Sequence, residues 1–195
     1  KIAKDWTCNH SSDIWWIDGT DAFVSFLKSG DLVLDVGCGS GVKSKYLVAK
    51  GLRVLGFDFS EKMIEIAQRE VPAACFVVAD VHDLSGIEGM FDGIFAQAVL
   101  LHIPKKEARA VMEILLGKLK PGGYVYVAVK ERKPEAPEEA IKTEENYGYQ
   151  YGRFFSYFTP DEMKKYFTDL SLNIVYEDFS STMTDDWIQL IGHKI

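Results

Sequence analysis

A glycine-rich turn lies between two segments that the sequence predicts to be a buried strand and a helix. It reads Asp35-Val36-Gly37-Cys38-Gly39-Ser40-Gly41. Glycines let the backbone pass close to a ligand, and their N–H groups and the helix end can bind polar groups. The G-x-G-x-G spacing is one residue shorter than the dinucleotide pattern G-x-G-x-x-G. We therefore expect an adenosine-containing cofactor, with Asp35 near a positive group; the alternative is a tight turn without a ligand.

Two more acidic residues follow predicted strands in the same half of the chain. Asp58 comes after the run 53–57, where a carboxylate can accept both hydroxyls of a ribose. Asp80 comes after the run 75–79, where it can accept an adenine amino hydrogen. Taken alone, Asp58 could equally be a residue that caps the following helix. Taken alone, Asp80 could equally be a turn residue. Because the carboxyl ends of parallel strands open on one crevice, the acids and the glycine turn together favour a single cofactor site.

The elements that must position these residues alternate as short apolar runs and amphipathic segments. The predicted strands cover residues 32–36, 53–57, 75–79, 91–98 and 124–129. The predicted helices cover residues 42–50 and 60–70, with a third after Pro104. This alternation is typical of parallel strands joined by right-handed helical crossovers.

The last part of the chain breaks this alternation. Thr159, followed by Pro160 and then by Glu162, has the spacing of a capping box and predicts the start of a helix. Two runs at 173–179 and 187–193 have no helix between them, which predicts an antiparallel hairpin at the sheet edge.

We expect residues 1–195 to form a single domain. Residues 1–30 would be a cap or lid, with a helix at 22–28, and residues 131–158 a mobile insertion and acceptor-side loop.

These blocks resemble class I S-adenosylmethionine-dependent methyltransferases over about residues 30–193. The resemblance rests on residues 32–41, 54–60 with Met63, 79–81, 91–95, 101–104 and 119–124. It implies an α/β, Rossmann-like three-layer sandwich. Its seven-stranded, mostly parallel sheet would have the order 3-2-1-4-5-7-6, with the last inserted strand antiparallel. It also implies S-adenosylmethionine as cofactor and S-adenosylhomocysteine as product.

The resemblance also implies roles for the matching residues. Gly37, Cys38, Gly39 and Gly41 would form the turn beside the methionine and ribose, Asp35 would face the methionine ammonium, and Asp58 would hold the ribose hydroxyls. Phe59, Met63, Asp80 and Val81 would surround the adenine. Gln97 and Ala98 would lie near the transferred methyl group. His82, next to Val81, is a candidate for the adenine border, and a plain loop histidine is the alternative.

The acceptor side is predicted from a cluster of aromatic residues between positions 147 and 158. Tyr151, Arg153 and Phe154 are candidate substrate-binding residues there. Arg153 could pair with a carboxylate of the acceptor or of the cofactor. The alternative is that the aromatic residues cover the sheet edge and Arg153 is solvated.

Three residues elsewhere are further candidates for the acceptor side. Trp15 and Trp16 are candidates for an aromatic lid that excludes water, with packing of the first helix as the alternative. His102 is the candidate catalytic base, because a histidine pKa lies near neutrality; a structural histidine is the alternative.

Composition and charge restrict the partners. Lys and Arg number 22 and Asp and Glu 29, so the net charge is −7. This charge disfavours nucleic acids and anionic membranes as partners. No apolar run approaches the ~20 residues that span a bilayer.

The three cysteines form no C-x-x-C pair, which favours a reducing, cytoplasmic location. We expect no metal site. Cys8 and His10 lie close together, but two residues do not make a metal site.

We therefore predict a methyltransferase that acts on a small, partly apolar molecule by in-line displacement. The residues that end the fourth strand, Ala96-Gln97-Ala98-Val99, carry no Asn-Pro-Pro-Tyr-type signature, which would suggest an amide or adenine nitrogen as acceptor. Together with the net charge of −7, this disfavours nucleic acid as the substrate. A catalytically silent cofactor-binding module that supports a partner, and a nicotinamide-dependent oxidoreductase, are the alternatives. Asp58 fits the oxidoreductase equally well, whereas Asp35 and the terminal hairpin favour the methyltransferase. The oligomeric state stays open.

Overall fold

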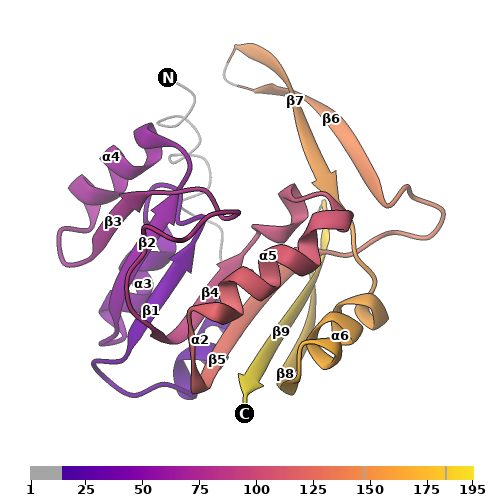
Figure 1. Cartoon of the computed structure of the whole chain (residues 1–195). Coiled ribbons are helices and arrows are strands. Elements are labelled where there is room, and N and C mark those ends of the chain that lie inside the picture. Colours follow the sequence, from indigo (N-terminus) through magenta and orange to yellow (C-terminus); the bar gives the residue numbers. More distant parts are fainter. Residues whose placement is uncertain (1–14, 147, 183) are drawn as a thin grey trace.

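Seven strands form one sheet with helices on both faces, in a computed structural model that describes residues 15–146, 148–182 and 184–195 (Figure 1). The strands of this sheet are β1 (Leu32–Val36), β2 (Arg53–Asp58), β3 (Cys75–Val78), β4 (Phe91–Gln97), β5 (Leu119–Lys130), β8 (Leu172–Ser181) and β9 (Asp186–Lys194). Their order is β3-β2-β1-β4-β5-β9-β8, and β9 pairs antiparallel with both neighbours. Numbered within this sheet, the order is the predicted 3-2-1-4-5-7-6, so the fold prediction is confirmed.

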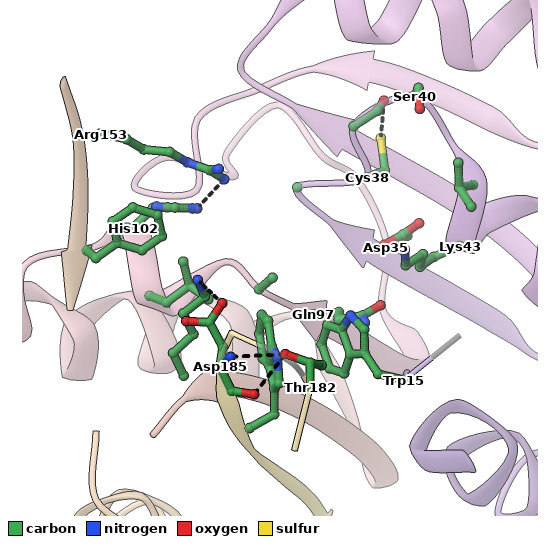
Figure 2. Close-up of a pocket in the computed structure, with 18 of the residues that line it drawn as sticks. Trp15, Asp35, Cys38, Ser40, Lys43, Gln97, His102, Arg153, Thr182 and Asp185 are labelled. Atoms are coloured by element: carbon green, nitrogen blue, oxygen red, sulfur yellow. Dashed lines mark hydrogen bonds and ion pairs between the residues drawn. The ribbon is translucent and has the colours of Figure 1, made fainter. Parts of the chain in front are cut away.

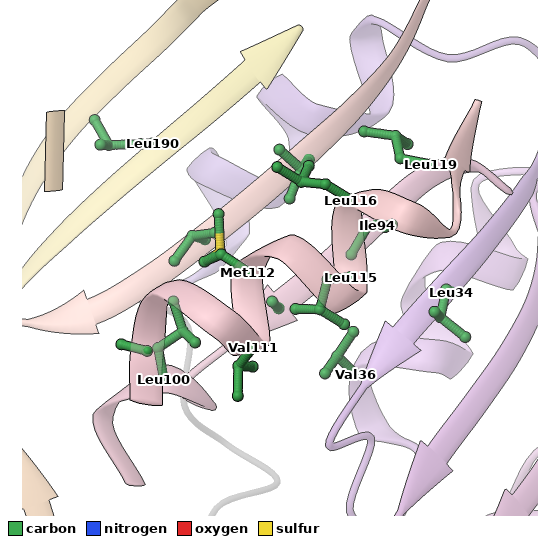
Figure 3. Packing of buried hydrophobic residues seen from close by; sticks show 14 of the residues in the cluster. Leu34, Val36, Ile94, Leu100, Val111, Met112, Leu115, Leu116, Leu119 and Leu190 are labelled. Carbon is green, nitrogen blue, oxygen red and sulfur yellow. The ribbon is translucent and has the colours of Figure 1, made fainter. Parts of the chain in front are cut away.

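Helices cover the two faces because alternate residues of each buried strand point to opposite sides. The helices are α2 (Ile17–Ser25), α3 (Val42–Ala49), α4 (Glu61–Glu70), α5 (Lys105–Gly117), α6 (Pro160–Asp169) and the short 3-10 helix η1 (Leu100–His102). Val33 and Phe95 pack in one cluster with residues of α2 and α3. Leu34 and Ile94, their neighbours along the strands, pack on the other face with Leu115 of α5 (Figure 3). None of these helices is long and apolar enough to cross a membrane within the part of the chain that is described.

The helix start predicted at Thr159 is confirmed. The Glu162 N–H donates to Thr159 Oγ1 at 3.2 Å, and the Thr159 N–H donates to Glu162 Oε2 at 3.3 Å. Both bonds of the capping box are therefore present at the start of α6.

Three elements differ from the prediction. Residues 139–156 form an antiparallel hairpin instead of a loop, made of β6 (Glu139–Asn146) and β7 (Tyr149–Ser156), which projects beyond the sheet (Figure 1). Helix α2 covers Ile17–Ser25 instead of residues 22–28. Strand β5 begins at Leu119 instead of residue 124, because the Pro121–Gly123 segment forms an irregularity within the strand and not a separate turn.

The direction of β8 brings one more turn to the carboxyl edge of the sheet. Because β8 pairs antiparallel with β9 and β9 pairs antiparallel with β5, β8 runs in the same direction as β5. Residues 182, 184 and 185, which follow β8, therefore lie at the edge where β1 and β4 also end.

Candidate active site

A cavity of about 510 Å³ lies at the carboxyl edge of the sheet (Figure 2). Its walls come from the glycine turn, the ends of β4 and β5, the inner face of β7, the β8–β9 turn and Trp15. Asp35 and Ser40 lie on one wall, and His102 and Arg153 lie on the opposite wall. The topology thus places residues from distant parts of the chain around one space.

The glycine turn adopts a backbone that only glycine accepts without strain. Gly37, Gly39 and Gly41 have φ angles of 61°, 54° and 83°, in the left-handed region. A Cβ atom at Gly37 would lie 2.9 Å from Val99 Cγ2, which follows β4. Gly37 and Gly39 therefore line the cavity with backbone alone, whereas Gly41 lies outside the cavity, where a Cβ atom would be 3.1 Å from Val71 Cγ2.

Asp58 ties the glycine turn to the end of β2. Its Oδ2 accepts the Gly39 N–H at 3.0 Å, and its Oδ1 accepts the Ser60 N–H at 2.9 Å. Burial raises the pKa of Asp58, and the two N–H groups counteract part of that rise. Each carboxylate oxygen keeps a second lone pair, so Asp58 can still accept ribose hydroxyls, although it does not line the 510 Å³ cavity itself.

Asp35 presents a buried carboxyl group to the cavity. Ser44 Oγ donates to Asp35 Oδ2 at 2.5 Å, and the side chain is only 2% exposed. Burial raises the pKa of Asp35 to about 7, against the opposing effects of Ser44 and Lys43. A buried carboxyl that has no ion pair with another described residue is suited to receive a positive ligand group.

Two buried polar atoms on the cavity have no hydrogen-bond partner among the described residues. These atoms are Ser40 Oγ and Gln97 Oε1. Buried polar atoms without a partner are rare in folded proteins, so these two are places where a ligand would supply the partner. Ala98, which follows Gln97, has a φ of 57°, and such strain in a residue other than glycine is common at functional sites.

The residues implied for the adenine lie beside the ends of β2 and β3, outside this cavity. The Ala79 N–H donates to the Asp58 carbonyl at 3.1 Å, which brings the two strand ends together. The Phe59 ring is 82% exposed, and Val81 and Met63 are partly buried. Asp80 Oδ1 accepts the His82 N–H at 2.9 Å and lies 2.7 Å from His82 Nδ1. These bonds lower the pKa of Asp80.

On the opposite wall, Arg153 Nη2 donates to His102 Nε2 at 2.7 Å. A guanidinium group can only donate, so Nε2 must be the unprotonated ring nitrogen. His102 Nδ1–H accordingly donates to the Phe154 carbonyl at 2.9 Å. Burial, followed by the charge of Arg153, lowers the pKa of His102 to about 4. The ring is therefore neutral near pH 7, and the atom that a catalytic base would use already accepts a hydrogen bond.

The other predicted acceptor residues divide between the cavity and its surroundings. Trp15 lines the cavity and stacks on Trp187 at 3.8 Å between ring centroids. Trp16 is not among the lining residues: it is 5% exposed and packs edge-on against Tyr46. Tyr151 lies further along the hairpin and donates from its hydroxyl to Glu144 at 2.9 Å.

The Phe154 carbonyl accepts a hydrogen bond from His102, but Phe154 does not line the cavity. Its neighbour Phe155 lines the cavity in its place. Strand geometry explains this difference, because Arg153 and Phe155 share one face of β7 while Phe154 points to the other.

Lys130, Asp185 and Trp187 line the cavity but were missed by the sequence reasoning. Lys130 Nζ lies 2.8 Å from Asp185 Oδ2, and Lys130 is opposite Trp187 in the β5–β9 register. The predicted strand order already contained the signal, since it places the turn after β8 at the carboxyl edge of the sheet.

No group of three or more His, Cys, Asp or Glu side chains is placed to hold a metal in the part of the chain that is described. Cys8 and His10 lie outside the described residues. Burial raises the pKa of the Cys38 thiol, so this cysteine in the glycine turn is protonated near neutral pH.

Comparison with known proteins identifies the family. Residues 33–123 match the family model described as a methyltransferase domain. Residues 33–123 carry a methyltransferase domain of this family. Together with the strand order, this match confirms the resemblance to class I S-adenosylmethionine-dependent methyltransferases.

Curated relatives of this methyltransferase domain have different acceptors in their names. The chain is 37% identical over 122 residues to phosphoethanolamine N-methyltransferase 1 of Zea mays, covering 60% of this chain and 24% of the relative. It is 33% identical over 114 residues to ubiquinone biosynthesis O-methyltransferase of Chromobacterium violaceum, covering 55% of this chain and 48% of the relative. The chain thus spans about a quarter to a half of the length of these relatives.

A solved structure shares the fold of the described part of this chain. Magnesium protoporphyrin IX methyltransferase from Synechocystis PCC 6803, solved with bound S-adenosylmethionine, superposes with a TM-score of 0.72 at 22% identity. The match covers 98% of this chain and 83% of that one. The methyltransferase fold therefore extends past residue 123, through the C-terminal strands.

Proposed function

We propose that the chain is an S-adenosylmethionine-dependent methyltransferase that acts on a small-molecule acceptor. One observation carries the proposal: the glycine turn, the Asp35 carboxyl and the two unpartnered atoms of Ser40 and Gln97 open on one cavity. The methyltransferase names of the relatives and the bound S-adenosylmethionine of the Synechocystis enzyme support it. The cysteine pattern supports a cytoplasmic location.

The residues at the carboxyl edge fit this cofactor in shape and charge. Asp35 would bind the methionine ammonium, and Asp58 would accept the ribose hydroxyls while it holds the glycine turn in place. The exposed Phe59 ring would pack against the adenine, with Asp80 at its amino group. When bound, the cofactor would supply a sulfonium-linked methyl group for in-line displacement.

The chain's own contribution to the rate would be alignment and exclusion of water. Trp15, Trp187 and Phe155 form an apolar boundary around the acceptor end of the cavity. Good alignment of two reactants can contribute about 7–11 kcal/mol. Because His102 Nε2 already accepts the Arg153 hydrogen bond, we expect an acceptor atom that needs no strong base, such as a free amine, a thiolate or an ionised hydroxyl.

Calorimetric titration tests the cofactor assignment. Protein stripped of carried-over ligand would be titrated separately with S-adenosylmethionine, S-adenosylhomocysteine, NADH and NADPH. We expect micromolar binding of the two sulfur ligands and no binding of the nicotinamides. Binding of a nicotinamide alone would contradict the proposal and favour hydride transfer.

A second measurement separates an enzyme from a silent binding module. Formation of S-adenosylhomocysteine would be followed over a panel of small amines, thiols, phenols and acids. Acceptor-dependent product formation is expected. Tight cofactor binding without turnover on any member of a broad panel would favour the silent module.

A further inference from the structure

The guanidinium of Arg153 has hydrogen-bond donors to spare at the acceptor end of the cavity. Its one hydrogen bond among the described residues goes to His102 Nε2, and its side chain is 35% exposed. The Glu144 carboxylate lies 3.7 Å away, which is beyond hydrogen-bond distance. Since a guanidinium carries five N–H donors in a planar fork, several of them remain for a ligand.

The direct partner of Arg153 also leaves its charge largely in place. Neutral His102 accepts a hydrogen bond but brings no negative charge. Lys130 and Lys142 also lie beside the Phe155 ring, and only Lys130 lines the cavity. Lys130 differs from Arg153, because its Nζ is 2.8 Å from the Asp185 carboxylate and the two side chains are 15% and 21% exposed. Lys130 is therefore paired with a carboxylate at hydrogen-bond distance, whereas the ion pair of Arg153 with Glu144 is longer, at 3.7 Å. The N–H donors of Arg153 that make no hydrogen bond among the described residues remain for an anion.

His102 is built to hold Arg153 in this position. Its Nδ1–H is fixed by the Phe154 carbonyl at 2.9 Å, so its Nε2 points toward the guanidinium (Figure 2). Phe155 adds a second constraint, because its ring centroid lies 5.2 Å from Arg153 Cζ and 5.0 Å from the His102 ring centroid. Preorganisation of this kind lowers the entropic cost of binding a ligand.

The neighbouring surface is aromatic. The Phe155 ring lies beside the guanidinium, and the stacked Trp15 and Trp187 offer flat apolar contacts elsewhere on the wall of the same cavity. A planar ligand body fits such a boundary, and a guanidinium fork fits a carboxylate or a phosphate.

From these contacts we propose that the acceptor is a flat, partly apolar molecule with an oxyanion group, a carboxylate or a phosphate. Arg153 binds that group, and His102 is the positioning residue that holds Arg153. The inference rests on the proposed function, because it names the substrate class of the same cavity.

Pairs of probes that share an aromatic ring, one anionic and one neutral, test this inference. The protein, saturated with S-adenosylhomocysteine, would be titrated with para-hydroxybenzoate and para-hydroxybenzamide, and with phenyl phosphate and phenol. We expect at least one anionic probe to bind about tenfold more tightly than its neutral partner, a difference of about 1.4 kcal/mol. The two pairs distinguish a preference for carboxylate from one for phosphate.

Arg153→Gln should abolish this preference and leave the affinity for S-adenosylhomocysteine unchanged. Arg153→Lys should keep part of it, because the charge stays but the planar fork is lost. Lys142→Gln is the matched control: Lys142 lies opposite Arg153 in the hairpin and does not line the cavity. This control removes the same charge and should keep the preference.

The test of His102 must distinguish a positioning residue from a catalytic base. His102→Ala should reduce the preference for the anionic probe while the neutral probe binds as before, and His102→Gln should restore part of it through its amide oxygen. A base would leave the preference intact and lower turnover alone.

Three outcomes would overturn the inference. Equal affinity for charged and neutral probes would do so, as would no binding of any probe up to millimolar concentration while S-adenosylhomocysteine binds. Loss of S-adenosylhomocysteine affinity in Arg153→Gln, with the probe preference unchanged, would assign Arg153 to the carboxylate of the cofactor. If S-adenosylhomocysteine fails to bind the unaltered protein, the proposed function fails, and this inference fails with it.

Discussion

At the scale of single residues, the burial of the Asp35 carboxylate lowers the stability of the fold and leaves a negative charge for a positive ligand group. Its pKa is about 7 in the folded protein, against an ordinary value of 3.8. Between these two values the folded chain binds more protons than the unfolded chain, so the free energy of unfolding falls as the pH rises. Above about pH 7 the buried charge carries its full cost, which is up to about 4 kcal/mol at 1.36 kcal/mol per pKa unit.

Asp35→Asn should therefore stabilise the protein at pH 8 and have little effect near pH 4. At the same time it should weaken binding of S-adenosylmethionine, because the carboxylate that would meet the ammonium is gone. Thermal unfolding at both pH values and calorimetry on the same variant check this. A variant that loses stability at pH 8 would contradict the assigned pKa shift.

Asp58→Ala should weaken S-adenosylhomocysteine binding by about 1.5–3 kcal/mol, the scale of hydrogen bonds to a charged group. This corresponds to about a 10- to 150-fold change in Kd. Asp83→Ala is the matched control, since Asp83 Oδ1 accepts the N–H two residues ahead, at Ser85, as Asp58 Oδ1 does at Ser60. Calorimetry that finds equal affinity in the Asp58 variant and the control would remove Asp58 from the ribose site.

The residues that sequence reasoning identified and those it missed differ in what positions them. The glycine turn and Asp58 are fixed by local strand–turn–helix geometry, which a short window of sequence contains. Lys130 and Trp187 meet only through the β5–β9 register, and that register joins strands far apart in the chain. Trp15 and Trp16 are adjacent in sequence, so which of them faces the cavity depends on how the chain enters α2.

At the scale of elements, the start of α6 offers a direct test of local stability. Thr159→Ala removes the hydroxyl that caps the helix, and we expect a loss of about 1 kcal/mol in the free energy of unfolding. Thr168→Ala is a suitable control, because Thr168 lies in the same helix and its hydroxyl donates to the Lys164 carbonyl at an exposed position. Denaturant unfolding of both variants should separate them, and equal midpoints would contradict a role for the cap.

The β6–β7 hairpin shows why one element escaped prediction. Strand β6 is acidic and has few apolar residues, a composition that is typical of a solvated loop. Its pairing with the aromatic strand β7 and bonds at its base hold it instead. Ser156 Oγ donates to the Ile103 carbonyl at 2.6 Å, and Glu139 accepts the Lys105 N–H at 2.6 Å. These contacts join segments more than 30 residues apart, which a local pattern cannot reveal.

At the scale of the whole molecule, stability should fall from the central strands toward the hairpin. Strands β1 and β4 and residues 125–129 of β5 are mostly buried, whereas β6 has many exposed residues. Amide hydrogen exchange should therefore be slowest in the central strands and fastest in the outer part of the hairpin.

S-adenosylhomocysteine at 100 times its Kd should raise the free energy of unfolding by about 2.7 kcal/mol. The added protection should concentrate at the glycine turn and the ends of β2 and β4. Exchange measured with and without ligand checks this prediction. Protection confined to the hairpin would place the ligand elsewhere.

The family match ends at residue 123, and the side chains that would contact the acceptor come largely after it: Lys130, Arg153, Phe155 and Trp187. Most of the acceptor wall is therefore encoded after the residues of the cofactor site, whereas Trp15 and His102 precede residue 123. A recombination near the start of β5 would exchange most of the acceptor wall and leave the glycine turn, Asp35 and Asp58 unchanged. Such an arrangement lets acceptor specificity change under selection while the residues that bind the methyl donor stay the same.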